Sequence, residues 1–149
     1  MLRALLITVI LLAGVSTGVL AQEAPNSVGM VKNVSGNAHV VRDGRSLAAT
    51  PGFELFLGDR VTTDSNGSMG IMLRDETALS LGASTDTSIE QFVFEPRENK
   101  LGMVLRVGRG IFCYLSGRIA KLAPGSVRIE TPVATLGVRG TYFVARIVP

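Results

Sequence analysis

The side chains that most often do covalent chemistry are scarce in this chain. His39 is its only histidine and Cys113 its only cysteine, so a histidine-based catalytic triad and the usual zinc site both lack companions. No serine lies in a nucleophile-elbow pattern, and no predicted helix follows the GRG run at 108–110, as one would follow a phosphate-binding loop. We therefore expect no catalytic residue, no metal ion, no cofactor and no enzymatic activity.

Two charged residues beside glycines are better candidates for contact with another molecule. Asp59 could bind a metal, but no acid-rich loop surrounds it, which favours a carboxylate that accepts backbone N–H bonds in a turn. Arg139 could fix its own turn or meet an acidic group of a partner. Its apolar neighbour favours the structural role, with Asp59 as a salt-bridge partner. The candidate interaction residues are Gly58, Asp59, Gly137, Arg139, Gly140 and Thr141.

The elements that must position these residues are predicted to be short strands. Runs of β-formers alternate with glycine, proline, asparagine and aspartate throughout residues 28–149, and the NG pair at 66–67 is a strong hairpin signal. Residues 127–130 alternate apolar and charged side chains, as a strand with one buried face does. The best helical candidate, residues 117–123, is short. The pattern predicts an all-β single domain and leaves a sandwich, a barrel or a solenoid open.

The first 21 residues have the features of a secretory leader. Arg3 supplies the positive start, residues 5–12 are apolar, and Val19 and Ala21 stand where a signal peptidase inspects its substrate. An uncleaved anchor is the alternative, although glycine and polar residues interrupt the apolar run. We expect cleavage after Ala21, a flexible mature N-terminus at 22–27, and a β domain at 28–149. No later stretch is apolar over enough residues to cross a bilayer, so the mature chain is expected to have no transmembrane helix.

The charge distribution, the single cysteine, the single histidine and the aromatic residues predict the surface and the core. The formal net charge is +3 and the basic residues are scattered, whereas nucleic-acid proteins more often show a continuous basic stripe. We expect no nucleic-acid partner. Cys113 cannot form an internal disulfide and is expected to be a small buried hydrophobe, with an intermolecular bridge or a reactive thiol as the alternative. His39 is expected on a solvent-exposed face. The core is expected to contain Phe92, Phe94, Phe112, Tyr142 and Phe143, with an aromatic binding surface as the alternative.

Several motifs occur in the order found in FecR-type periplasmic domains. They include GDRVTT at 58–63, LSLG at 79–82, and the run TPVATLGVRGTYFV at 131–144. The chain resembles that family over most of its mature length. The resemblance implies an all-β, solenoid-like fold with two facing sheets, with a β-sandwich as the alternative, and a periplasmic location. One departure is Glu76, where family members often carry glycine between aspartate and threonine. We therefore expect a type I turn without positive φ there.

The resemblance favours a non-enzymatic periplasmic module that mediates protein–protein contacts, with a possible signalling role, in the bacterial envelope. Namesake proteins also carry a cytoplasmic segment and a transmembrane helix, neither of which is recognised in this chain, so their transmembrane signalling role is not expected here. The partner is expected to be a protein of the periplasm or outer membrane. The alternatives are a structural protein that self-associates through open β edges and, less favoured, a hydrolase.

Overall fold

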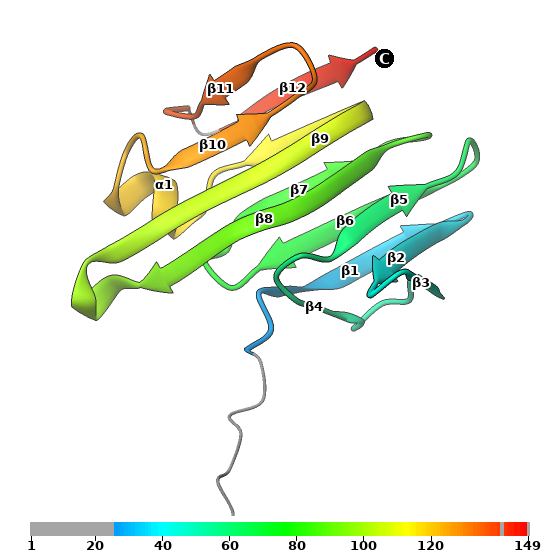
Figure 1. Cartoon of the computed structure of the whole chain (residues 1–149), viewed down its shortest axis with the longest axis horizontal. Coiled ribbons are helices and arrows are strands. Elements are labelled where there is room, and N and C mark those ends of the chain that lie inside the picture. The colour runs from blue at the N-terminus through cyan, green and yellow to red at the C-terminus, as the bar shows by residue number, and fades with distance from the viewer. Residues whose placement is uncertain (1–25, 141, 149) are drawn as a thin grey trace, which may run out of the picture.

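The structure, a computed structural model, describes residues 26–140 and 142–148. The predicted leader, its cleavage site after Ala21, most of the predicted flexible N-terminus and Thr141 lie outside the described residues. The described chain is all-β, as predicted, apart from a single-turn 3₁₀ helix and one short α-helix. Figure 1 shows its strands arranged in two layers.

The two layers are two sheets that share one long strand, β9 (Lys100–Leu115). Sheet A has the order β4, β1, β6, β7, the second half of β9, and β12. Its other strands are β1 (Gly29–Ser35), β4 (Glu54–Leu55), β6 (Ser68–Leu73), β7 (Ala78–Leu81) and β12 (Tyr142–Ile147).

Sheet B has the order β3, β2, β5, β8, the first half of β9, β10 and β11. Its other strands are β2 (Ala38–Arg42), β3 (Arg45–Ala48), β5 (Arg60–Thr63), β8 (Asp86–Glu95), β10 (Val127–Glu130) and β11 (Thr135–Gly137). The 3₁₀ helix η1 (Pro96–Glu98) joins β8 to β9, and α1 (Arg118–Leu122) follows β9. The prediction of two facing sheets is confirmed.

A glycine lets β9 pass from one sheet to the other. Gly110 has φ +105°, and a Cβ there would lie 2.3 Å from the Oγ1 atom of Thr85. Thr85 is buried, and its hydroxyl accepts the N–H of Ile111 at 3.0 Å. After the crossing, the chain runs through α1 and returns as β10, which pairs parallel to the first half of β9. This return completes one coil and makes the fold solenoid-like.

The core lies between the sheets because each strand buries alternate side chains, as in the pattern of β6. The aromatic residues Phe92 and Phe112 are buried in it, as predicted, and Phe94 and Phe143 pack against it. Tyr142, in contrast, is 60% exposed, so its predicted core position is wrong. Cys113 is half-buried and contacts the Tyr142 hydroxyl at 3.3 Å, so it is not a core residue either.

The outer faces of the two sheets differ in polarity. On sheet B, Arg106 pairs with Glu130 at 3.1 Å and with Glu90 at 3.6 Å, and Arg60 pairs with Asp86. On sheet A the strand registers place a mostly apolar row across five strands. The row consists of Met30, Met72, Ala78, Leu115 and Tyr142.

The turn between β6 and β7 does not have the predicted conformation. Glu76 has φ 68°, the left-handed region in which a Cβ is crowded. The expectation of a type I turn without positive φ is therefore wrong. The surrounding contacts enforce the conformation, since Glu76 N–H donates to Leu73 and Leu73 N–H donates to Thr77. Glycine is the residue that this backbone favours.

Replacing Glu76 with glycine is expected to raise the free energy of unfolding by about 0.5–1 kcal/mol. Relief of left-handed strain exceeds the greater freedom that glycine gives the unfolded chain. Urea denaturation of both proteins measures the change. Ser80→Gly, at an exposed position in β7 with no positive φ, is the control and should lose stability. A loss of stability in both variants would contradict the prediction.

Candidate functional site

The predicted candidates fall in two separate places, and the first is an ion pair between a buried carboxylate and a partly exposed arginine. Asp59 is 2% exposed, and its carboxylate accepts two bonds from Arg42, Nε to Oδ1 at 2.9 Å and Nη2 to Oδ2 at 2.7 Å. It also accepts the N–H of Phe56 at 2.8 Å, the kind of turn contact that the sequence favours for it. The hydrogen bond with Asp59 is the main reason why the pKa of Arg42 is raised. The predicted partnership of Asp59 with Arg139 is wrong.

Arg42 closes one end of the two-sheet stack. It belongs to β2 of sheet B, donates to the carbonyl of Glu54 in β4 of sheet A at 2.9 Å, and lies over the rings of Phe53 and Phe56. Gly58, with φ +86°, forms the turn that leads into Asp59. Among the described residues no acidic cluster around Asp59 could hold a metal ion. The geometry therefore gives Gly58 and Asp59 a structural task at what we call the closed end.

A second buried carboxylate, Asp75, was missed by the sequence reasoning as a key residue. Its Oδ1 accepts the N–H of Thr77 at 3.1 Å, and its Oδ2 accepts the Thr77 hydroxyl at 2.8 Å and the N–H of Ile119 at 3.2 Å. Arg118 N–H donates to its backbone carbonyl at 2.6 Å. Asp75 thus ties the start of α1 to the β6–β7 turn. An aspartate two residues before a threonine, just after a buried strand, is the signal that could have revealed this turn.

The buried contacts continue from Asp75 toward the C-terminal motif. The aromatic ring of Tyr114 stacks on Phe143 of β12 with 5.2 Å between centroids. Ser116 donates its hydroxyl to the carbonyl of Gly140. The Tyr114 hydroxyl is buried without a hydrogen bond among the described residues, although Ser116 and Thr77 lie near it. These contacts fix the segment 138–140 and the start of β12 on the body of the fold.

Stability should fall as pH rises above about 10, the ordinary pKa of tyrosine. Burial is the main cause that raises the pKa of Tyr114, although the nearby Ser116 and Thr77 hydroxyls oppose it. Below the unfolded pKa both states are protonated. Above it the unfolded chain loses its proton first, so the free energy of unfolding decreases until the folded pKa is reached. Urea denaturation across alkaline pH measures this, and Tyr114→Phe should remove most of the decrease.

Tyr142→Phe is the control for this titration, since Tyr142 is the other of the two tyrosines in the chain. The contact with Cys113 raises the pKa of Tyr142, but water screens that exposed group. The control should keep the larger part of the alkaline decrease. The prediction would be wrong if the decrease persisted in Tyr114→Phe and vanished in Tyr142→Phe.

The second group of candidates lies on the surface. Arg139 is exposed and forms no ion pair with the described residues, so its side chain is free of the salt bridge predicted for it. Gly137 ends β11, and Gly140 lies just before Thr141, which is outside the described residues. Val138 is buried and its N–H donates to Val127 at 3.0 Å. The segment 136–140, with Tyr142 and Phe143, lines a groove of about 280 Å³.

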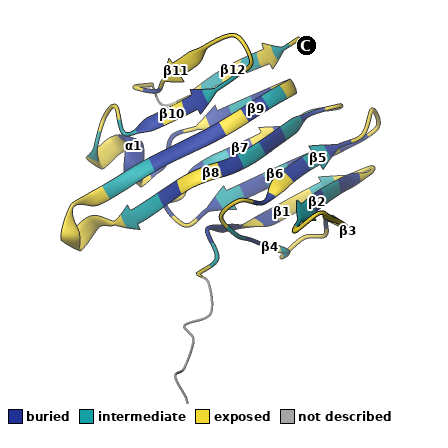
Figure 2. Cartoon of the chain, in the orientation of Figure 1, coloured by how far each residue is buried: buried dark blue, intermediate teal, exposed yellow. Residues whose placement is uncertain are grey.

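This groove belongs to the end of the stack opposite Arg42, which we call the open end and define as β11, the segment 138–140 and β12. Leu136 is 41% exposed, although it pairs across the sheet with Ile129, which is 1% exposed. Phe143 and Ile147 face the core from β12 and are half-buried. Figure 2 shows β11 in the colour of exposed residues. Both sheets therefore stop here with part of the core uncovered.

The comparison with protein families agrees with the order of the sequence motifs. Neither a curated protein nor a solved structure matches the chain. Among the described residues no helix has the length and apolar character that a membrane crossing needs. Residues 59–148 match the protein family described as FecR protein, a region that starts at the Asp59 turn and includes all of the open end. Because this region is more than half of the 149 residues, the chain belongs to the FecR protein family.

Proposed function

We propose that the protein is a non-enzymatic, periplasmic binding module that acts in regulation or signalling by holding a protein partner at its open end. FecR proteins are a signalling and regulatory family. The observation that carries the proposal is the uncovered core between β11 and β12, where Leu136 and Phe143 lie beside the exposed Arg139. Exposed strand edges next to apolar side chains are what an added protein segment requires.

The position of the family motif also favours the open end as the binding site. Gly58 and Asp59 have a complete structural explanation in the Arg42 ion pair. The exposed part of the C-terminal motif has none: Val133 is 90% exposed, and Arg139 extends from a turn whose own backbone is held by Val138 and Ser116. A well-anchored backbone that presents free side chains suits recognition of a partner.

A pull-down from periplasmic extract tests the proposal. The mature chain should retain a specific protein, and Arg139→Ala should reduce its retention at least about tenfold, because an exposed arginine at a binding surface is a frequent hot spot. Urea denaturation should show unfolding within about 0.5 kcal/mol of the parent, since Arg139 is exposed. The control is Arg45→Ala, in β3 at the closed end.

The result that contradicts this site is equal retention by Arg139→Ala and Arg45→Ala. Unfolding of the Arg139 variant would also remove the site, since the side chain would then be structural. The same purified material tests the leader, because intact-mass measurement of protein recovered from the periplasm should give a chain that begins at Gln22.

Self-association in the envelope is the second candidate function. The apolar row on the outer face of sheet A favours it, with Met30, Leu115 and Tyr142 all exposed. Light scattering over a wide concentration range decides between the two. A mass that rises with concentration would support self-association, whereas a constant monomer mass would exclude it.

A further inference from the structure

The open end offers a complete edge for one more strand in sheet A. β12 has six residues, about 20 Å of extended chain, and among the described residues β9 is its one hydrogen-bonded neighbour. Its side chains alternate, so that Tyr142, Val144 and Arg146 face outward while Phe143, Ala145 and Ile147 face the core. The free backbone groups of such an edge are a template for pairing with an extended segment.

The side of β12 that faces the core sets the first requirement for that segment. Phe143 and Ile147 remain half-buried, and Leu136 across the groove is exposed. A strand added beside β12 would place every second side chain over this uncovered part of the core. Those side chains must be apolar, because their burial is the main favourable term.

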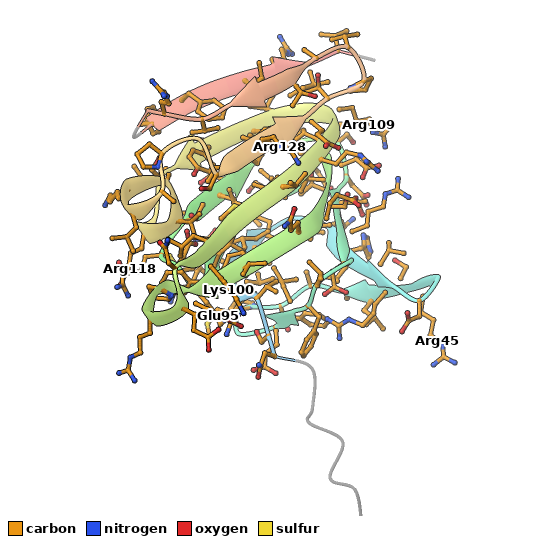
Figure 3. All side chains as sticks on the ribbon, turned by 60° about the vertical axis from the view of Figure 1, so that its left-hand side comes forward. Arg45, Glu95, Lys100, Arg109, Arg118 and Arg128 are labelled. Carbon is orange, nitrogen blue, oxygen red and sulfur yellow. The ribbon has the colours of Figure 1, made fainter. Side chains whose placement is uncertain are left out.

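The charge of the open end sets the second requirement. The C-terminal part of the chain, residues 101–148, includes most of β9, α1 and β10 as well as the open end, and it contains seven arginines and lysines but a single acid, Glu130. Residues 26–100 contain seven basic and ten acidic residues. Glu130 already pairs with Arg106. Arg128, Arg139 and Arg146 form no ion pair with a described residue. Figure 3 shows Arg128 and Arg109 toward this end and Arg45 at the opposite one.

The same charges argue against a second copy of the chain as the occupant. An antiparallel pair of β12 strands would bring the Arg146 side chains of both copies to one interface, where charges of the same sign disfavour association. Basic side chains on an edge strand discourage pairing with identical edges. An acidic partner meets no such barrier and gains cross-strand ion pairs.

We propose that the open end binds an extended acidic segment of a partner protein, which adds to β12 as a strand with apolar side chains over Phe143 and Ile147 and carboxylates toward Arg146. The proposal rests on the proposed function and specifies its binding mode and the partner's chemistry. The edges at the closed end are shorter than β12, because β4 has two residues and β3 has four.

A designed peptide tests this directly. The probe is a fluorescent peptide of about eight residues that alternates valine with glutamate, the periodicity of one strand. Anisotropy should show binding to the mature chain, and hydrogen exchange should show new protection of amides in 142–147. Arg146→Glu should weaken binding at least about tenfold, whereas Arg45→Glu, the same charge change at the other end, should leave it unchanged.

Two further peptides separate strand addition from simple charge attraction. The valine–lysine analogue should not bind. The valine–glutamate peptide with every backbone amide N-methylated should lose binding, because it keeps its charge but has no N–H group to pair along either edge. Equal binding by the N-methylated peptide, or an equal loss in Arg45→Glu, would overturn the inference. Absence of binding by the parent peptide at millimolar concentration would overturn it as well.

The remaining outcomes separate this inference from the proposed function. If the chain alone forms a dimer whose 142–147 amides are protected, the occupant is a second copy and the inference is wrong. If a periplasmic partner is retained through Arg139 but no peptide binds, the binding function stands and strand addition by an acidic segment is wrong. If neither binds, both are wrong.

Discussion

Replacing Arg42 with alanine is expected to lower the free energy of unfolding by about 3 kcal/mol, because the change leaves the buried carboxylate of Asp59 without its counter-ion. Asp59 would keep one hydrogen bond, from the N–H of Phe56. The guanidinium also covers the Phe53 and Phe56 rings and binds the Glu54 carbonyl, so packing between β2 and β4 is lost as well. Urea denaturation measures the loss.

A double-mutant cycle isolates the charge contribution. Asp59→Asn retains an acceptor for Phe56 but removes the buried charge, so Arg42→Ala in that background should cost at least about 1 kcal/mol less than in the parent. The exposed neighbour Arg45→Ala should change stability by no more than about 0.5 kcal/mol. Additive losses in the cycle would show that the buried charge is not what makes Arg42 necessary.

The fold could be predicted from the sequence because its causes are local. Strand lengths, glycine turns and alternating side chains are all set by neighbours in the chain, and the motif order identified the family. The short helix α1 also lies within the predicted residues 117–123. The strand alternation of β10 is the predicted one, with Val127 and Ile129 buried.

The errors concern contacts between distant parts of the chain. Nothing near Asp59 in the sequence indicates that Arg42, seventeen residues earlier, would reach it before Arg139 does. Cys113 and Tyr142 lie in strands with the same alternation as their buried neighbours. Whether their side chains face the core or the solvent depends on the strand register, which cannot be read from the sequence. The positive φ of Glu76 follows from the contacts of its neighbours, since Asp75 is bonded to α1 and Thr77 is bonded to Asp75, and the first of these is a tertiary contact.

The sequence indicated candidate residues within the C-terminal motif but not their positions in space. Gly137, Arg139 and Gly140 were chosen for their composition, and the structure places them at the end where the core is uncovered. The asymmetry between the ends could not be predicted, because it depends on which strands lack a neighbour. Arg42 covers one end, and nothing among the described residues has that role beside β12.

The buried carboxylate of Asp75 leads to the second large effect. Asp75→Ala is expected to lower the free energy of unfolding by about 3–5 kcal/mol, because the N–H groups of Thr77 and Ile119 and the Thr77 hydroxyl all lose their acceptor in a dry environment. Thermal or urea denaturation measures the loss.

Two further variants show why Asp75 matters for binding as well as for stability. Asp64→Ala removes an exposed carboxylate that makes no side-chain hydrogen bond among the described residues, and it should cost no more than about 0.5 kcal/mol. The loss of stability in Asp75→Asn, which keeps one acceptor oxygen, should fall between the losses in Asp75→Ala and Asp64→Ala.

Because Asp75 holds α1 and Ser116 holds Gly140, hydrogen exchange at 138–147 should quicken in Asp75→Ala and partner binding should weaken with it. Unchanged exchange at 138–147 in a destabilised Asp75→Ala would mean that the open end is held independently of this carboxylate.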